Sequence, residues 1–393
     1  MLAARACHRW AGGQHLKFWR SSLRSARHLS HGRKWQHQGR GTVLNSAASQ
    51  SRKSVVFFGT PQVAVPVLDG LIQAASQPDS TFDVTGVVSQ PARPSGRGSR
   101  RNPPPSPVAQ AAARAGIPQD RILTPERAGD AGFLDALRSL HPDLLVTAAY
   151  GNYLPTRLLG IPRQGTLNIH PSLLPAYRGA APVQRALMDG LTQTGVSVLY
   201  SVREMDAGPV LAQAAYEIPE DVQAPELTQR LFELGTRLLL DALPDVWAGM
   251  GPSLALPQDA ATATAAPKLS SADAALDLGL PAAAVHARVR ACAGWPGSSV
   301  AFLVRDPAGR ESALTLKVLR TRLAESSGPG TEVQNTSQEP NQVELAPGAL
   351  TVRCGDGGRL SILELQVPGR RPVSPAAFIN GLRGATLSWV PIR

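Results

Sequence analysis

Three polar side chains in this sequence have the types and spacing of a site for acyl-group transfer. Asn168 and His170 flank Ile169 in a stretch of strand character, and alternate residues of a strand lie on the same face. An amide donor beside an imidazole can stabilise the negative oxygen that forms when a nucleophile attacks a carbonyl group. Asp206, in a later Asp-Ala-Gly turn, could orient the imidazole or stabilise its charge.

Each of these residues also has a structural interpretation, since a histidine at a strand end often serves only the fold and an aspartate commonly initiates a turn. The residues after His170 favour the functional interpretation. Two leucines held between prolines form a rigid apolar wall that would be out of place in an ordinary loop. The residues of this wall are Ser172, Leu173, Leu174 and Pro175.

Other kinds of site lack their sequence signals. Gly59 follows the first strand, but the motif is not Gly-x-Gly-x-x-Gly, and Pro61 removes a backbone donor that a pyrophosphate would need. No phosphate-binding loop of the Gly-x-x-x-x-Gly-Lys type occurs, so we expect no nucleotide cofactor. Cys7, Cys292 and Cys354 are too far apart for zinc-ligand spacing or a disulfide framework, so we expect no metal.

The residues around the three polar side chains predict alternating strands and helices. Such alternation indicates an α/β fold with a parallel, doubly wound sheet, which forms its ligand sites at the carboxyl ends of strands. Asn168 and His170 lie at such an end. The predicted strands are Ser54–Phe58, Phe82–Ser89, Asp143–Tyr150, Thr166–His170 and Gly195–Ser201, and the predicted helices are Val63–Ala75, 108–115, 128–140 and Glu226–Trp247.

Beyond the closing helix the composition changes twice. Met250–Pro267 is rich in Ala, Pro, Thr and Gly, which is typical of a linker, and many short strand-like runs then indicate a small β-barrel. The predicted domains are a targeting or disordered segment at 1–53, a catalytic domain at 54–249, a linker at 250–270 and a barrel domain at 271–393.

The first 53 residues carry the whole charge excess of the chain. They contain eight Arg, three Lys and no acidic residue, which accounts for the net charge of +11, so the remainder is neutral. An Arg- and Ser-rich, acid-poor N-terminus that can form an amphipathic helix is typical of a mitochondrial transit peptide, and we expect a location in the mitochondrial matrix. A disordered basic arm that binds nucleic acid is the alternative. The sequence has no run of about 18 apolar residues, so we expect no membrane span.

The motif Asn-x-His-x-Ser-Leu-Leu-Pro-x-x-Arg-Gly, followed by the Asp206 turn, resembles the formyltransferases that use 10-formyltetrahydrofolate. Within that superfamily, the chain from about Val55 through Pro391 resembles the methionyl-tRNA formyltransferases, and the N-terminal segment resembles that of a mitochondrial form. No single motif is specific, but the set is. The motifs are Phe58-Gly-Thr-Pro61, Gln90-Pro-x-Arg-Pro-x-Gly-Arg-Gly98, Pro105-Ser-Pro-Val108, Ala149-Tyr-Gly151 and Arg178-Gly-Ala-Ala-Pro-Val-Gln184.

The resemblance implies a Rossmann-like formyltransferase domain followed by a C-terminal barrel of the oligonucleotide-binding type. It implies transfer of a formyl group from 10-formyltetrahydrofolate to the α-amine of methionine on initiator tRNA. Asn168, His170 and Asp206 would be the catalytic residues. The folate would lie against the wall of Ser172, Leu173, Leu174 and Pro175, and against the backbone of Ala149, Tyr150 and Gly151.

The chemistry of these groups suggests a mechanism without a metal or a covalent enzyme nucleophile. The amine attacks the formyl carbon, and Asn168 donates a hydrogen bond to the resulting oxyanion. His170, charged beside Asp206, stabilises the same oxygen or relays a proton to the folate nitrogen, and Asp206 could also take the proton of the amine. The sequence does not assign each proton transfer. It departs from the family's usual Leu-Asp-Thr-Gly turn, because Met205 and Ala207 replace Leu and Thr.

An arginine cluster is the candidate contact for the tRNA acceptor stem. The resemblance implies that this loop helps to select the initiator tRNA, and an arginine can both grip phosphate and stack on bases. Arg97 is the best single candidate, although such clusters are often only solvated loops. The residues proposed to contact tRNA are Arg93, Arg97, Arg100, Arg101 and Lys268.

Two other classes of function stay open at this point. A 10-formyltetrahydrofolate hydrolase or a glycinamide ribonucleotide formyltransferase would share the catalytic residues, but would need neither the arginine cluster nor the barrel. A non-enzymatic RNA-binding relative should have lost at least one of Asn168, His170 and Asp206, and all three are present. We expect a monomer whose partners are tRNA and folate, with no membrane association.

Overall fold

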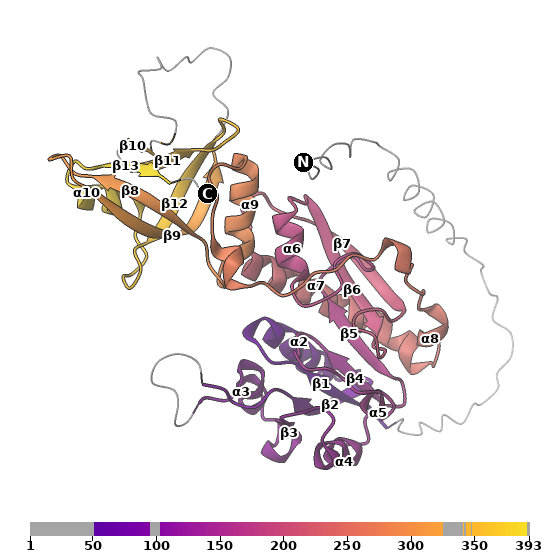
Figure 1. Cartoon of the computed structure of the whole chain (residues 1–393). Coiled ribbons are helices and arrows are strands. Elements are labelled where there is room, and N and C mark those ends of the chain that lie inside the picture. Colours follow the sequence, from indigo (N-terminus) through magenta and orange to yellow (C-terminus); the bar gives the residue numbers. More distant parts are fainter. Residues whose placement is uncertain (1–50, 95–102, 325–340, 342, 347, 391–393) are drawn as a thin grey trace, which may run out of the picture. The chain divides into compact units, whose positions relative to one another are not determined.

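A computed structural model of the chain describes residues 51–94, 103–324, 341, 343–346 and 348–390 (Figure 1). Almost all of the predicted targeting segment lies outside the described residues, as do Arg97, Arg100 and Arg101. The first strand, β1, begins at Lys53, the last residue of the strongly basic N-terminal part of the sequence.

The described residues before 250 contain a seven-stranded sheet in the order β3-β2-β1-β4-β5-β6-β7 (Figure 1). The first five strands of that order are parallel to one another, whereas β6 is antiparallel to both β5 and β7. The predicted Rossmann-like α/β fold is thereby confirmed. The strands are β1 (Lys53–Phe58), β2 (Phe82–Val88), β3 (Ile122–Leu123), β4 (Leu144–Thr147), β5 (Thr166–His170), β6 (Gln193–Tyr200) and β7 (Val210–Glu217).

The two antiparallel pairings of β6, with β5 and with β7, differ from the parallel sheet that the sequence predicted. Strand β7 follows β6 in the chain. Residues 201–209 alone join the two strands, and this connection is too short for a parallel return, which needs a dozen or more residues and usually a helix. Asp206 lies in this connection. A hairpin of the sheet, and not a loop between a strand and a helix, therefore carries the predicted catalytic carboxylate.

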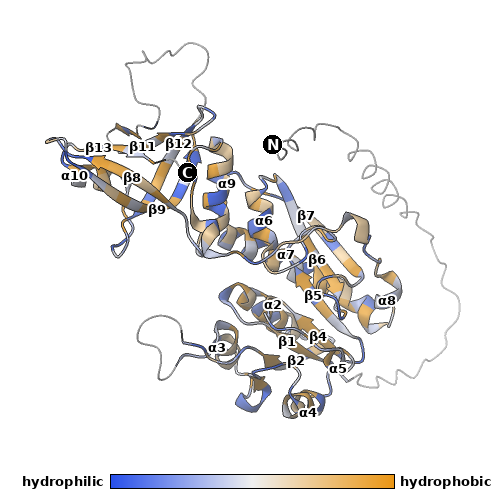
Figure 2. Cartoon of the chain, viewed as in Figure 1, coloured by the Kyte–Doolittle hydropathy of each residue, from blue (hydrophilic) through white to orange (hydrophobic). Residues whose placement is uncertain are grey.

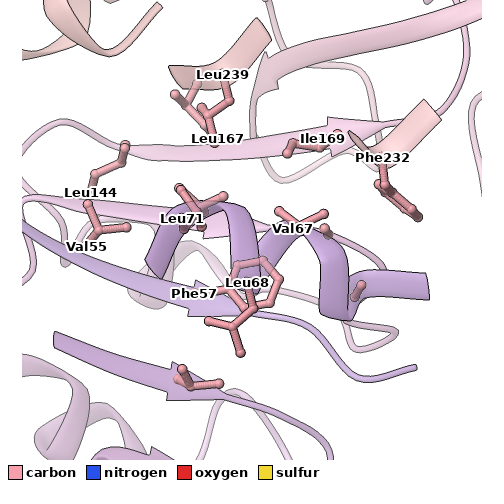
Figure 3. Close-up of a cluster of buried hydrophobic side chains, with 14 of the residues drawn as sticks. Val55, Phe57, Val67, Leu68, Leu71, Leu144, Leu167, Ile169, Phe232 and Leu239 are labelled. Carbon is pink, nitrogen blue, oxygen red and sulfur yellow. The ribbon is translucent and has the colours of Figure 1, made fainter. Parts of the chain in front are cut away.

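Both faces of the sheet are buried, and alternate residues of the inner strand β1 point to opposite faces. Val55 and Phe57 of β1 belong to one hydrophobic core, and Val56 and Phe58 belong to another. Figure 3 shows the first core, in which Leu68 of α2 is among the labelled side chains packed over the strands. Burying each large apolar side chain stabilises the fold by about 1.5–3 kcal/mol. The helices are α2 (Val65–Ala75), α3 (Pro107–Arg114), α4 (Ala131–Ser139), α5 (Thr156–Leu159), α6 (Pro182–Met188), α7 (Ala224–Trp247) and α8 (Gly251–Leu254).

The residues after 270 form the predicted barrel. Its six antiparallel strands have the order β10-β11-β12-β9-β8-β13, and the N–H of Trp389 donates to the carbonyl of Asn341 (3.0 Å), which brings β13 close to the strand at the other end of that order. The elements are α9 (Ala282–Cys292), β8 (Ser299–Arg305), β9 (Glu311–Leu323), β10 (Val343–Ala346), β11 (Ala349–Arg353), β12 (Arg359–Gln366), α10 (Pro375–Leu382) and β13 (Thr386–Trp389).

Figure 2 shows the most hydrophobic residues along the strands of the first sheet, whereas the helices carry both hydrophobic and hydrophilic residues. That pattern is expected of a sheet covered on both faces by amphipathic helices. Among the described residues, none of the helices combines the length and the apolar character that a membrane crossing requires.

Candidate active site

The three residues predicted to be catalytic lie together in the structure. Asn168 and His170 are on β5, and Asp206 reaches both from the β6–β7 connection. The Nδ2 atom of Asn168 donates to Oδ1 of Asp206 (3.3 Å), and Nδ1 of His170 lies 3.7 Å from Oδ2 of the same carboxylate. The side chains of His170 and Asp206 are only 5% and 12% exposed, so solvent screens their interaction weakly.

The amide of Asn168 is fixed in one orientation by two neighbours. Thr147, on the adjacent strand β4, donates its hydroxyl to Oδ1 (2.7 Å), and this leaves the NH₂ end of the amide toward Asp206. Thr147 is directly opposite Asn168 in the parallel pairing of β4 and β5. The amide carries two N–H groups, and the bond to Asp206 uses one of them.

The ring of His170 has a different environment at each nitrogen. Nε2 lies 2.9 Å from the backbone carbonyl of Tyr177, which can only accept, so Nε2 carries a proton. Nδ1 faces Asp206. Because its imidazole is 5% exposed and bonded on one side, the ring has a fixed direction, and Nδ1 is the nitrogen at which a proton can be gained or given.

Asp206 occupies a backbone conformation that residues with a side chain rarely adopt, with φ of 52°. Its carboxylate accepts the N–H of Gly179 at Oδ2 (2.9 Å), in addition to the amide of Asn168. Gly208, two residues later, has no room for a side chain, since an added Cβ would lie 1.8 Å from the carbonyl oxygen of Tyr200. The Asp-Ala-Gly motif therefore makes a turn whose shape places the carboxylate.

The predicted apolar wall follows His170 directly, and a single hydroxyl holds its backbone. Ser197, on β6, donates to the carbonyl of Ser172 (2.6 Å) and accepts both the N–H of Leu174 (3.1 Å) and the amide of Gln213 (2.8 Å). Ser197 and Ser172 are fully buried, Leu174 is buried, and Leu173 is partly exposed. The peptide bond that precedes Pro175 is cis.

The segment of Ala149, Tyr150 and Gly151 follows the carboxyl end of β4. The carbonyl of Tyr150 accepts the hydroxyl of Thr60 (2.8 Å) and the side-chain amide of Gln90 (3.1 Å). The ring of Tyr150 packs in the core against Phe58, and burial raises the pKa of its hydroxyl. This segment therefore presents backbone, and not the tyrosine side chain, to any ligand.

Two of the predicted tRNA contacts are described, and neither lies in the cluster of Asn168, His170 and Asp206. Arg93 is exposed and its guanidinium lies 3.9 Å from the carboxylate of Glu126. Lys268 is exposed just before the barrel. Among the described residues, no group of three or more His, Cys, Asp or Glu side chains could hold a metal ion.

Sequence reasoning missed three residues that support the cluster. Thr147 could have been found, because two adjacent predicted strands place it opposite Asn168. Tyr177, whose carbonyl holds His170, and Gln258, which bonds to the Asp206 turn, had no local signal. Tyr177 donates its hydroxyl to Asp189 (2.8 Å), and burial together with that carboxylate raises the pKa of the tyrosine.

Comparisons with known proteins find similarity to formyl transferases along almost the whole described chain. The Formyl transferase family matches residues 52–243, and the Formyl transferase, C-terminal domain family matches residues 268–383. A methionyl-tRNA formyltransferase of Roseiflexus castenholzii is 39% identical over 84% of this chain and 96% of its own length. One of Anaeromyxobacter dehalogenans is 40% identical over 84% of this chain and 97% of its own length.

A solved structure with the same fold is HypX from Aquifex aeolicus in complex with tetrahydrofolic acid. Its TM-score to this chain is 0.55 and its sequence identity is 18%, over 85% of this chain. The chain spans about half the length of HypX, 48%. At this identity, the likeness supports the fold alone.

Proposed function

The chain belongs to the methionyl-tRNA formyltransferases, and from that premise we propose that Asn168, His170 and Asp206 carry out formyl transfer from 10-formyltetrahydrofolate to the α-amine of methionine on initiator tRNA. The observation that carries the proposal is the meeting of an oriented amide, an imidazole and a carboxylate at one end of β5. These groups suit a reaction in which an oxygen gains negative charge while protons move between nitrogens.

In the proposed reaction the amine nitrogen bonds to the formyl carbon and the bond from that carbon to the folate nitrogen breaks. The amine loses one proton and the folate nitrogen gains one. Asn168 donates its second N–H to the oxyanion, and Asp206 accepts the proton of the amine. His170 gives a proton to the leaving nitrogen from Nδ1, since Nε2 is bonded to the Tyr177 carbonyl.

We propose that the wall of Ser172, Leu173, Leu174 and Pro175 and the backbone of residues 149–151 bind the folate. Leu173, three residues after His170, is partly exposed, and its apolar side chain suits the flat aromatic part of a folate. HypX, which shares the fold, has been crystallised with tetrahydrofolic acid, so a protein with this fold can bind a folate.

The tRNA is proposed to contact the arginine cluster of residues 93–101 and the barrel domain. Arg93 is exposed at the start of this cluster and makes only a long ion pair in the described structure, so it is available to a phosphate. Lys268 is proposed to add a contact beside the barrel.

We further propose that residues 1–53 direct the protein to the mitochondrial matrix. The support is their charge and the absence of acidic residues up to β1. N-terminal sequencing of the protein isolated from mitochondria should give a mature chain that lacks roughly the first 30–50 residues. An intact Met1 in the matrix would contradict this.

The function is tested by single-turnover formylation of charged initiator tRNA with the variants Asn168→Ala, His170→Ala and Asp206→Ala. Each should lower the rate by at least about 100-fold, because each group acts on charge that develops in the transition state. The double variant of His170 and Asp206 should be little slower than the slower single variant, since groups that act as a unit are non-additive.

The matched control is Asp135→Ala, which removes an exposed carboxylate of α4 that pairs with Arg138. It should leave the rate unchanged. A near-normal rate for Asn168→Ala or His170→Ala in folded protein would exclude that residue from the reaction.

A further inference from the structure

The segment 255–266, which composition marked as a linker, is bonded to both loops of the candidate active site. Leu256 exchanges two backbone hydrogen bonds with Val210, at the end of the Asp206 connection (2.8 Å each). Farther along, the N–H of Arg178 donates to the carbonyl of Thr264 (2.8 Å), and the N–H of Ala266 donates to the carbonyl of Arg178 (2.6 Å). The segment thus runs from the aspartate turn to the loop that follows the apolar wall.

Gln258 lies between these two attachments in the sequence, and both the nitrogen and the oxygen of its side-chain amide are hydrogen-bonded to the two loops. Nε2 donates to the carbonyl of Asp206 and to the carbonyl of Gly208, each at 2.7 Å. Oε1 accepts from Nε of Arg178 at 2.9 Å. One side chain therefore links the backbone of the aspartate turn to the guanidinium of Arg178, in the loop that follows the apolar wall.

The turn needs such a tie because its own conformation is unfavourable. Asp206 is held at φ of 52°, and this conformation persists only where the surroundings determine it. The bond to the Asp206 carbonyl acts on the residue whose carboxylate accepts from Asn168 and from the N–H of Gly179. The second bond, to Gly208, holds the far side of the turn, so the amide clamps both ends of a three-residue unit.

We propose that Gln258 is a positioning residue for formyl transfer, which acts by holding the carboxylate of Asp206 in place. The inference rests on the proposed role of Asp206. Through Gln258, the segment 255–266 would support catalysis although it lies outside the strands and loops that carry the reacting groups. A displacement of about 1 Å at a reacting group can lower a rate about 100-fold, so loss of this clamp should slow the reaction without removing any catalytic group.

The first variant is Gln258→Ala, which removes both donors and the acceptor. In single-turnover formylation with saturating folate and tRNA, its rate should fall about 10- to 100-fold. The KM for each substrate should change less than about threefold, because the clamp bears on the transition state. The control is Gln193→Ala, which removes an exposed amide bond to Glu217 at the far end of β6 and should leave the rate unchanged.

The second variant is Gln258→Glu, which has nearly the same shape. Its ionised carboxylate can still accept from Arg178, but it offers no donor to the two carbonyls of the turn. The rate should therefore be as low as that of the alanine variant. If the glutamate variant instead keeps the normal rate, the bond to Arg178 or simple space filling is what matters, and the proposal is overturned. This variant also keeps the test intact if the alanine variant does not fold.

The deciding measurement combines Gln258→Ala with Asp206→Ala. Because Gln258 is proposed to act through Asp206, the double variant should be no more than about twofold slower than Asp206→Ala alone. Rate losses that multiply would show that Gln258 acts elsewhere. A slow Asp206→Ala with a normal Gln258→Ala would overturn this inference alone, whereas a normal Asp206→Ala would overturn the proposed function and this inference with it.

Discussion

Replacing Asp206 by asparagine tests whether its charge, and not only its shape, serves the reaction. In the native site the carboxylate accepts from Asn168 and Gly179 and lies 3.7 Å from Nδ1 of His170. The asparagine keeps the size of the side chain. It must turn an NH₂ group toward one of two N–H donors, and it removes the negative charge that faces the imidazole.

Loss of the negative charge should lower the rate more than loss of one hydrogen-bond acceptor. Two unit charges about 4 Å apart interact by about 4 kcal/mol at an effective dielectric constant near 20, which suits two side chains as buried as these. Each 1.4 kcal/mol or so corresponds to a tenfold change in rate, so a protonated His170 without its partner should slow the reaction by up to about 1,000-fold. We expect a loss of about 100- to 1,000-fold.

The assay is single-turnover formylation of charged initiator tRNA, with folding checked by thermal unfolding and folate affinity measured separately. The asparagine variant should bind folate normally and react as slowly as Asp206→Ala. If it reacts at close to the native rate while Asp206→Ala is slow, then hydrogen bonding alone explains the role of the residue. The electrostatic part of the mechanism would then be wrong.

Three further predictions concern Thr147, the arginine cluster and His286. Thr147→Val removes the hydroxyl that orients Asn168 with little change of shape, and one hydrogen bond of about 1 kcal/mol predicts a fall of about fivefold in the formylation rate at unchanged folate affinity; an unchanged rate would mean that the amide is oriented without it. Arg97→Ala and Arg93→Ala should each weaken tRNA binding and reduce the slope of log affinity against log salt by about 1, while folate affinity stays constant; a slope unaffected by either change would leave these arginines as solvated surface residues. Burial lowers the pKa of His286 below its ordinary value of 6.5, so the unfolded chain takes up a proton that the folded one resists, and stability should fall as the pH drops through about 6.5 toward the lowered value; denaturant unfolding of His286→Gln should show a flatter pH dependence, and equal curves would contradict the assignment.

The cluster of Asn168, His170 and Asp206 was predictable because local rules place most of it. The two-residue period of a strand puts Asn168 and His170 on one face, and the carboxyl end of a strand in an α/β sheet is where sites form. The contact with Asp206 followed only from the motif as a whole, since strand geometry does not say how far a turn reaches. Only the structure gives the distances from Asp206 to Asn168 and to His170.

Gln258 was not predictable, because its contact with the Asp206 turn joins distant parts of the chain. Gln258 lies 52 residues from Asp206 in a segment whose composition favours no regular structure. Strand β7 was missed for a related reason. The strand propensity of β7 is weak because it contains Ala212, Ala214 and Ala215. Its pairing with β6 is what makes it a strand.

The hydrogen bonds of the Ser197 hydroxyl affect how tightly the proposed site can bind a folate. A serine hydroxyl has one proton and two lone pairs, and here all three are engaged, with Ser172, Leu174 and Gln213. The apolar wall is thus fastened to a strand of the sheet before any ligand arrives. Ordering a loop on binding lowers affinity, so a wall that is already ordered leaves more of the contact free energy available for holding the substrate.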